Sequence, residues 1–141
     1  MKVKVIMLFT FIVFILSGCT SEGSQRGFTF EGESKKWLVT LNGELAQETN
    51  GIYEEANAIF TYIGENDIRS SVIKMDNNGD RAMVSKNTGE LSNNDTVEMS
   101  FGNYRFWNLN EMGYDIFVIF EWREGEQNTK RKEEITLKLV E

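Results

Sequence analysis

From Phe28 onward, apolar and polar positions alternate along the chain with a period of two, which is the pattern of a strand with one buried face. Four segments show it most clearly, with apolar members Trp37/Val39/Leu41, Ala58/Phe60/Tyr62, Val97/Met99/Phe101 and Ile135/Leu137/Leu139. Segment 114–122 is apolar on both faces in its middle, which predicts a central strand covered on both sides or a strand packed near an edge contact. About seven to nine short strands, which recur roughly every 8–12 residues, predict an all-β, Ig-like antiparallel β-sandwich, with a barrel as the alternative.

Turn residues separate these segments. Asp76–Asp80 contains Asn78-Gly79 between two strand-like segments, and this dipeptide favours a β-hairpin. Segments 87–89 and 92–95 predict further turns. The charged segment 123–134 is interpreted as a connector between two late strands. Segment 44–57 could hold a helical turn, although Gly51 and the asparagines argue against a long helix.

The first nineteen residues follow a different pattern. Lys2 and Lys4 precede residues 5–16, in which Thr10 is the only polar residue. As a helix at ~1.5 Å per residue, that apolar segment is about 18 Å long. The apolar core of a bilayer is roughly 30 Å thick, so the segment predicts a secretory signal rather than a membrane span.

The segment ends in Leu16-Ser17-Gly18-Cys19, which resembles the lipobox of bacterial lipoproteins. The resemblance implies a diacylglycerol on the Cys19 thiol and cleavage between Gly18 and Cys19. Two acyl chains anchor a protein stably, so we expect the mature chain on the extracytoplasmic face of the cell membrane. The alternative is an ordinary signal peptide with a chance cysteine. The expected organisation is a signal peptide (1–18), a lipidated flexible tether (19–27) and one β-sandwich domain (28–141).

Composition narrows the classes of function. The chain has 15 basic and 22 acidic residues, and 13 basic residues remain without Lys2 and Lys4. An acidic domain is a poor candidate for binding nucleic acid. Cys19 is the only cysteine, so we expect no disulfide in the domain. The chain has no histidine, which excludes histidine-based catalysis and the usual zinc sites. We therefore expect a non-catalytic protein without a cofactor, with an enzyme that uses clustered carboxylates or a lysine as the alternative.

A second resemblance concerns Gly32-Glu33-Ser34-Lys35-Lys36-Trp37. This hexapeptide is similar to the Gly-Glu-Ser-x-x-Trp opening of small uncharacterised lipoproteins from Gram-positive firmicutes. Those proteins also close with a Trp-x-x-Gly strand and a Glu/Thr-rich strand, similar to residues 122–139 here. The resemblance implies an exported, lipid-anchored, Ig-like β-sandwich, and it brings no catalytic residues.

Three groups of charged residues have a surface interpretation. Asp76, Asn78 and Asp80 have the spacing of a calcium loop, but Arg81 and Asn87 break the pattern, so a hairpin turn is favoured and a metal there is left open. In each of the pairs Glu54-Glu55 and Glu133-Glu134, the two adjacent side chains of a strand point to opposite faces. They do not form a catalytic pair, so we expect solvated side chains. Segment 130–132 (Lys-Arg-Lys) is interpreted as a solubilising loop screened by nearby glutamates, with teichoic acid or lipid phosphate as alternative contacts.

An aromatic stretch supplies the candidate ligand site. Tyr104, Trp107 and Tyr114 lie close together in sequence, among several asparagines, and aromatic rings with amide neighbours suit sugar rings. The same rings also suit a core. We therefore expect an interaction module whose partner is an envelope protein, with a cell-wall glycan or small ligand bound near Trp107 as the alternative. Burial of the Trp107 ring would argue against the sugar, and the oligomeric state is left open.

Overall fold

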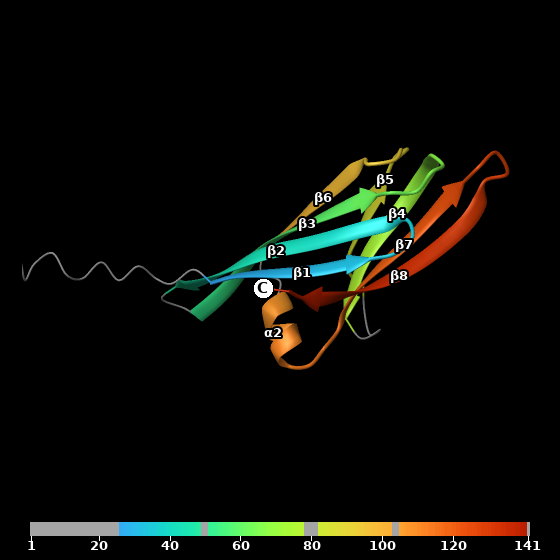
Figure 1. Ribbon diagram of the computed structural model, residues 1–141. Coiled ribbons are helices and arrows are strands. Elements are labelled where there is room, and N and C mark those ends of the chain that lie inside the picture. The colour runs from blue at the N-terminus through green and yellow to red at the C-terminus, as the bar shows by residue number, and fades with distance from the viewer. Residues whose placement is uncertain (1–25, 49–50, 78–81, 103–104, 141) are drawn as a thin grey trace, which may run out of the picture.

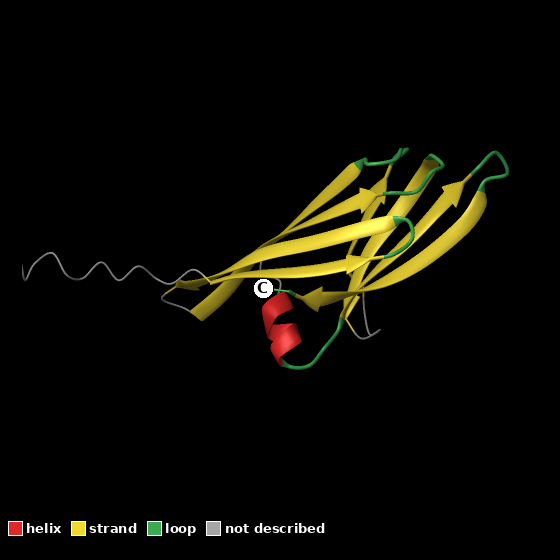
Figure 2. Cartoon of the chain, in the orientation of Figure 1, coloured by secondary structure: helices red, strands yellow, loops and turns green. Residues whose placement is uncertain are grey.

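The computed structural model of the chain describes residues 26–48, 51–77, 82–102 and 105–140. In these residues the chain forms antiparallel strands and one short helix (Figure 1, Figure 2). The elements are β1 (Arg26–Glu33), β2 (Trp37–Glu48), β3 (Gly51–Tyr62), β4 (Ile68–Asn77), β5 (Ala82–Thr88), β6 (Thr96–Gly102), α2 (Phe106–Glu111), β7 (Ile116–Glu124) and β8 (Thr129–Leu139). The expected all-β fold is confirmed.

The eight strands form one sheet in the order β5-β4-β7-β8-β1-β2-β3-β6. Strand β8 belongs to both halves of this sheet. It pairs with β7 from Thr129 to Leu137, and its last residues, Lys138 and Leu139, pair with β1. The sheet therefore folds over at β8 into two facing layers, β1-β2-β3-β6 and β4-β5-β7-β8, which is the architecture of a sandwich (Figure 1).

The two outer strands of the sheet, β5 and β6, are linked by side-chain and loop contacts. The Lys86 ammonium on β5 donates to the Glu98 carbonyl on β6 over 2.7 Å. Beside them, the backbones of Ile68 and Leu91 exchange two hydrogen bonds of 2.9 Å. The sandwich is thus nearly closed, and these contacts shield edges that could otherwise pair with another chain.

The predicted inward positions form the core. The residues singled out by the period of two are buried, except that Leu139 is only partly buried. Trp37 from one layer stacks on Phe120 from the other, with 4.2 Å between ring centroids and 14° between ring planes. Phe60 meets the same Phe120 edge-on at 6.0 Å. Aromatic contacts between the layers therefore hold the sandwich together.

One inward row is unusually small in its middle. Phe28, Gly43, Ala56 and Phe101 lie side by side across four strands. A Cβ on Gly43 would lie 2.0 Å from Cζ of Phe28, so the Phe28 ring occupies the space above the glycine. Helix α2 continues the packing, because Phe106 contacts Phe101 at 5.1 Å and Trp107 contacts Phe28 at 6.0 Å. The helix thereby closes this end of the core.

Two local expectations were wrong. Segment 44–57 holds no helical turn in its described part, because β2 and β3 stay paired from Trp37↔Tyr62 to Glu48↔Gly51. Segment 123–134 is mostly strand, with β7 ending at Glu124 and β8 beginning at Thr129. Its charged residues extend the hairpin past the core, where most of the polar side chains remain exposed on either face.

Two further boundaries differ in detail. Strand β1 already begins at Arg26, so the expected tether is two residues shorter at its domain end. In β7, which begins at Ile116, the inward side chains are buried, whereas the outward Phe117 and Ile119 are only half-buried. The strand is central in its layer, between β4 and β8, but the layer's outer face is not fully covered.

Candidate functional site

The hexapeptide 32–37 has a structural role in the fold. The Ser34 hydroxyl oxygen accepts the Trp37 N–H over 3.1 Å and closes the turn between β1 and β2. The Lys36 ammonium donates to the Glu124 carboxylate on β7 over 2.7 Å. Trp37 enters the core, as described above. The hexapeptide therefore joins the two layers at the end where the β7–β8 hairpin turns.

Glu124 is the centre of this junction. Its carboxylate also accepts the Arg131 Nε–H over 2.8 Å and the Trp122 Nε1–H over 3.2 Å. The hydrogen bond from Lys36 has the largest effect on the pKa of Glu124, and burial opposes it less strongly. The hydrogen bonds from the indole and the guanidinium add to the lowering, and the pKa falls to about 2. All of these contacts are structural, so we assign Glu124 to stability rather than to proton transfer.

Glu54 is the second notable carboxylate, and the expectation that it is solvated was wrong. It is 5% exposed, whereas the adjacent Glu55 is exposed on the opposite face of β3. The Glu54 carboxylate accepts the N–H groups of Trp107 over 3.1 Å and Asn108 over 3.3 Å. Burial raises the pKa of Glu54, and these two N–H groups partly oppose the rise. A carboxylate from a distant strand thus caps the first turn of α2.

The predicted aromatic site is only partly described. Tyr104 lies outside the described residues, as does Cys19. Trp107 is half-buried, and its ring contacts Phe28 and the Arg26 guanidinium, whose Cζ is 4.8 Å from the ring centroid. Tyr114 is 42% exposed in the loop after α2. Trp107 thus packs against β1, while Tyr114 is left at the surface, and a ligand site on these rings stays a prediction.

A polar row crosses the outer face of the β1-β2-β3-β6 layer. Thr29, Asn42, Asn57 and Ser100 are direct neighbours in register. The Thr29 hydroxyl donates to the side-chain amide oxygen of Asn42 over 3.1 Å. The Ser100 hydroxyl donates to the side-chain amide oxygen of Asn57, also over 3.1 Å. These bonds orient both amides and leave their N–H₂ groups without a partner among the described residues. The row therefore presents hydrogen-bond donors to solvent.

The next row along the strands presents acceptors. Gly27, Glu44, Glu55 and Gly102 are neighbours in register, so the two carboxylates lie between two glycines. A Cβ on Gly102 would meet nothing within 4 Å, so this edge of the row is open. The two rows line a hollow of about 810 Å³. An uncharged donor row beside an acceptor row suits a ligand that both donates and accepts hydrogen bonds.

The described residues contain neither a cluster that could hold a metal ion nor a helix that could span a membrane. In the described ranges, no three acidic, histidine or cysteine side chains gather closely enough to hold a metal ion. The β4–β5 hairpin is confirmed by antiparallel pairing as far as Asp76↔Ala82, but residues 78–81 of its turn lie outside the described residues. Within the same part of the chain, no helix is long and apolar enough to cross a bilayer.

No protein-family model, no curated protein and no solved structure matches this chain.

The polar row has only a weak signal in the sequence. Each of its members stands at an outward position of a strand, where a polar residue is ordinary. The register that aligns them across four strands is set by pairings between distant segments, and a single sequence does not contain it.

Proposed function

We propose that this chain is a lipoprotein, attached to the outer face of a membrane by lipid on Cys19, whose β-sandwich binds a partner without transforming it. The leader and the lipobox-like Leu16–Cys19 support the anchor. The structural contacts of Glu54 and Glu124 support a non-catalytic role, because Glu54 caps a helix and Glu124 joins the two layers. A general acid or base needs a carboxyl that is free to reach a substrate.

One observation favours a ligand class for this module. The donor row Thr29–Asn42–Asn57–Ser100 lies one strand repeat, about 6.6 Å, from the acceptor row that contains Glu44 and Glu55. Sugar hydroxyls both donate and accept at comparable spacing, so a glycan can pair with both rows. We therefore propose cell-wall glycan as the ligand, held on this face, while the exposed Tyr114 stays a secondary candidate.

The anchor is tested by metabolic labelling of the full chain with an alkyne analogue of palmitate in a bacterial host. Cys19→Ala is expected to abolish labelling and to leave the precursor uncleaved. Ser17→Ala is the matched control, since it keeps a small residue before the cleavage point. Labelling that persists in Cys19→Ala would refute the lipid anchor.

Glycan binding is tested with the full chain in neutral detergent, titrated with a tetramer of N-acetylglucosamine and pulled down with purified peptidoglycan. Loss of one or two hydrogen bonds costs about 1–1.5 kcal/mol, so Asn42→Ala should weaken binding about tenfold. Asn87→Ala makes the same change at an exposed position of β5, on the other layer, and should bind as the wild type does. Equal binding by both variants would exclude the polar row.

A further inference from the structure

The opposite layer carries a second surface of different chemistry. We propose that its outer face, at the β7–β8 turn, is a binding site for a phosphate-bearing anion formed by Ser70, Arg123 and Lys130, with Lys132 at its margin. We call this surface the basic groove. It is separate from the polar row, which lies on the other layer of the sandwich.

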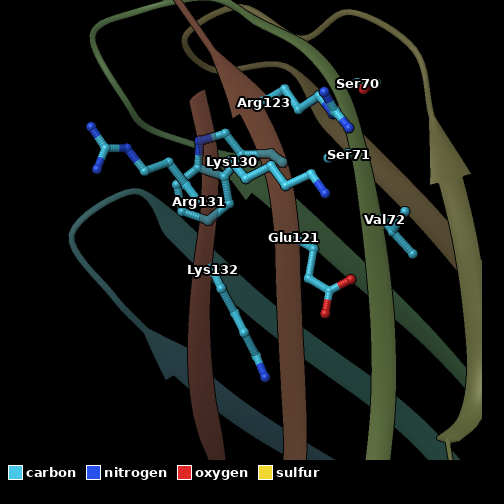
Figure 3. A pocket seen from close by; sticks show the side chains of 9 residues that line it. Ser70, Ser71, Val72, Glu121, Arg123, Lys130, Arg131 and Lys132 are labelled. Carbon is cyan, nitrogen blue, oxygen red and sulfur yellow. The ribbon is translucent and has the colours of Figure 1, made fainter. Parts of the chain in front are cut away.

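Register brings the groove residues together. On the face of β4-β7-β8, Arg123 lies directly between Ser70 on one neighbouring strand and Lys130 on the other. Figure 3 shows the Arg123 and Lys130 side chains extending in the same direction, toward the Ser70–Ser71 segment. The Arg131 side chain points away from them, toward its partner Glu124. Two cations therefore converge on one hydroxyl-bearing segment.

Among the described residues, no carboxylate forms an ion pair with the cations of the groove. Like charges directly opposite each other in a sheet are destabilising, and Arg123 opposite Lys130 is such a pair. Arg123, Lys130 and Lys132 form no ion pair with any residue that the structure describes. Glu121 also lines the groove, opposite Lys132, and it forms its ion pair with Lys74 at 3.0 Å. The chain as a whole is acidic, with 22 acidic and 15 basic residues, so this local excess of positive charge is unusual. Binding an external anion would neutralise it.

The backbone shapes a space for that anion. The groove encloses about 450 Å³ between β4, β7 and β8. Strand β4 has a register shift between Ile68 and Ser70, opposite the end of β7. Such bulges bend a strand and redirect its side chains. The Ser71 hydroxyl is buried and bonded to Thr88, whereas Ser70 is exposed at the groove, so Ser70 is the hydroxyl within reach of a ligand.

These groups fit phosphate better than other anions. A guanidinium presents parallel N–H donors that match two phosphate oxygens, a lysine ammonium adds a point charge, and a serine hydroxyl donates to a third oxygen. Phosphate of this kind occurs in soluble esters, in phosphodiester polymers and in lipid headgroups. The shared chemistry is the phosphate group, and the position of the groove discriminates among its sources.

Position favours a soluble or polymeric phosphate. The β7–β8 turn lies at the end of the sandwich opposite to the start of β1 (Figure 1). Counting ~3.3 Å per residue from Arg26 to Phe30 and back from Leu139 to Lys130, the groove is about 40 Å from the point where the domain joins its tether. If Cys19 is lipidated, as proposed above, the groove faces away from the anchoring membrane. We therefore assign the site to phosphodiester polymers of the envelope rather than to lipid headgroups.

The test uses the full chain in neutral detergent, titrated with soluble poly(glycerol phosphate) and, separately, with phosphatidylglycerol vesicles. We expect binding to the polymer, with amide shifts at Ser70, Arg123 and Lys130 in NMR spectra. Arg123→Gln/Lys130→Gln should weaken polymer binding about tenfold or more, because charge-assisted hydrogen bonds are lost. Lys35→Gln/Lys138→Gln removes the same charge at exposed sites outside the groove and should change binding less than about twofold.

Each other outcome has a defined meaning. Equal weakening by the two double variants would show general charge attraction and overturn the site, as would an absence of polymer binding by a wild-type chain with native circular dichroism. Binding to vesicles alone would overturn the assignment to a polymer. Since these titrations need no lipid on Cys19 and leave the polar row intact, their failure is distinguishable from failure of the proposed function.

Discussion

The indole of Trp37 and the ring of Phe120 lie nearly parallel, 4.2 Å apart, although they come from opposite layers of the sandwich. Trp37 follows the first turn of the domain, and Phe120 lies in its seventh strand. Both side chains have no exposed surface. Each ring is therefore buried by a residue from the other layer, and removing the contact should lower the stability of the whole domain.

Phe120→Ala is expected to lower the free energy of unfolding by about 3–5 kcal/mol, since it leaves a cavity beside Trp37 and Phe60. Phe117→Ala is the matched control, because Phe117 lies on the outer face of the same strand and is only half-buried. It should cost much less. Denaturant titration followed by tryptophan fluorescence measures both, and equal losses would contradict the assignment of inner and outer faces.

Glu124→Gln should remove stability that depends on pH. The pKa of Glu124 is lowered from 4.5 to about 2 in the folded chain, so its ion pairs stabilise the fold above pH 4.5 and are lost as pH falls toward 2. The variant should lose about 1–2 kcal/mol at pH 7, a discounted value because the Arg131 partner is exposed to solvent. The difference from wild type should shrink between pH 4.5 and pH 2.

The control for that experiment is Glu126→Gln in the same hairpin turn, where the side chain is exposed. Its unfolding free energy should follow that of the wild type throughout the pH range. A constant deficit of Glu124→Gln from pH 7 to pH 2 would show that the carboxylate acts through packing alone.

Glu54 should produce the opposite pH dependence. Burial raises its pKa above 4.5 in the folded chain, so the folded state holds its proton more tightly than the unfolded state does. Its contribution to stability is then greatest at low pH and falls as pH rises from 4.5 through the raised pKa. Glu54→Gln, compared by thermal unfolding with Glu55→Gln on the exposed face, should lack this decline. A decline of the same size in all three chains would contradict it.

Gly43→Ala should destabilise the domain by about 1–3 kcal/mol, because the added methyl group meets the Phe28 ring and forces it off its site. Gly102→Ala is the control, being a strand glycine with nothing within 4 Å of an added Cβ. Thermal unfolding compares the two variants. If both unfold at the same temperature, the small row under α2 has no role in packing.

The alternation of apolar residues was sufficient to predict the strands that form the core. Trp37, Phe60 and Ile135 were assigned inward positions from period alone, and each is buried. This worked because a one-residue change of register would expose an entire apolar set, so burial fixes the face of each strand.

The elements and contacts that the sequence did not predict depend on partners from distant segments. Helix α2 is only six residues long, too short to be stable by propensity, and it forms because Phe101, Phe28 and Glu54 offer ring contacts and a cap. The segment around Lys130 looked like a solubilising loop because its charges have no periodic pattern. Only pairing with β7 shows that Arg123 stands opposite Lys130.

The pairing of Phe30 with Leu139 also bears on how the chain reaches its folded state. A polypeptide threaded through a membrane from its N-terminus releases β1 first and β8 last. If this chain is exported as proposed, the sheet cannot close while its final strand is still in transit, so the chain stays competent for threading until the end. If Cys19 is by then attached to lipid, the two ends meet at a fixed point on a surface, which shortens the search that loop closure imposes.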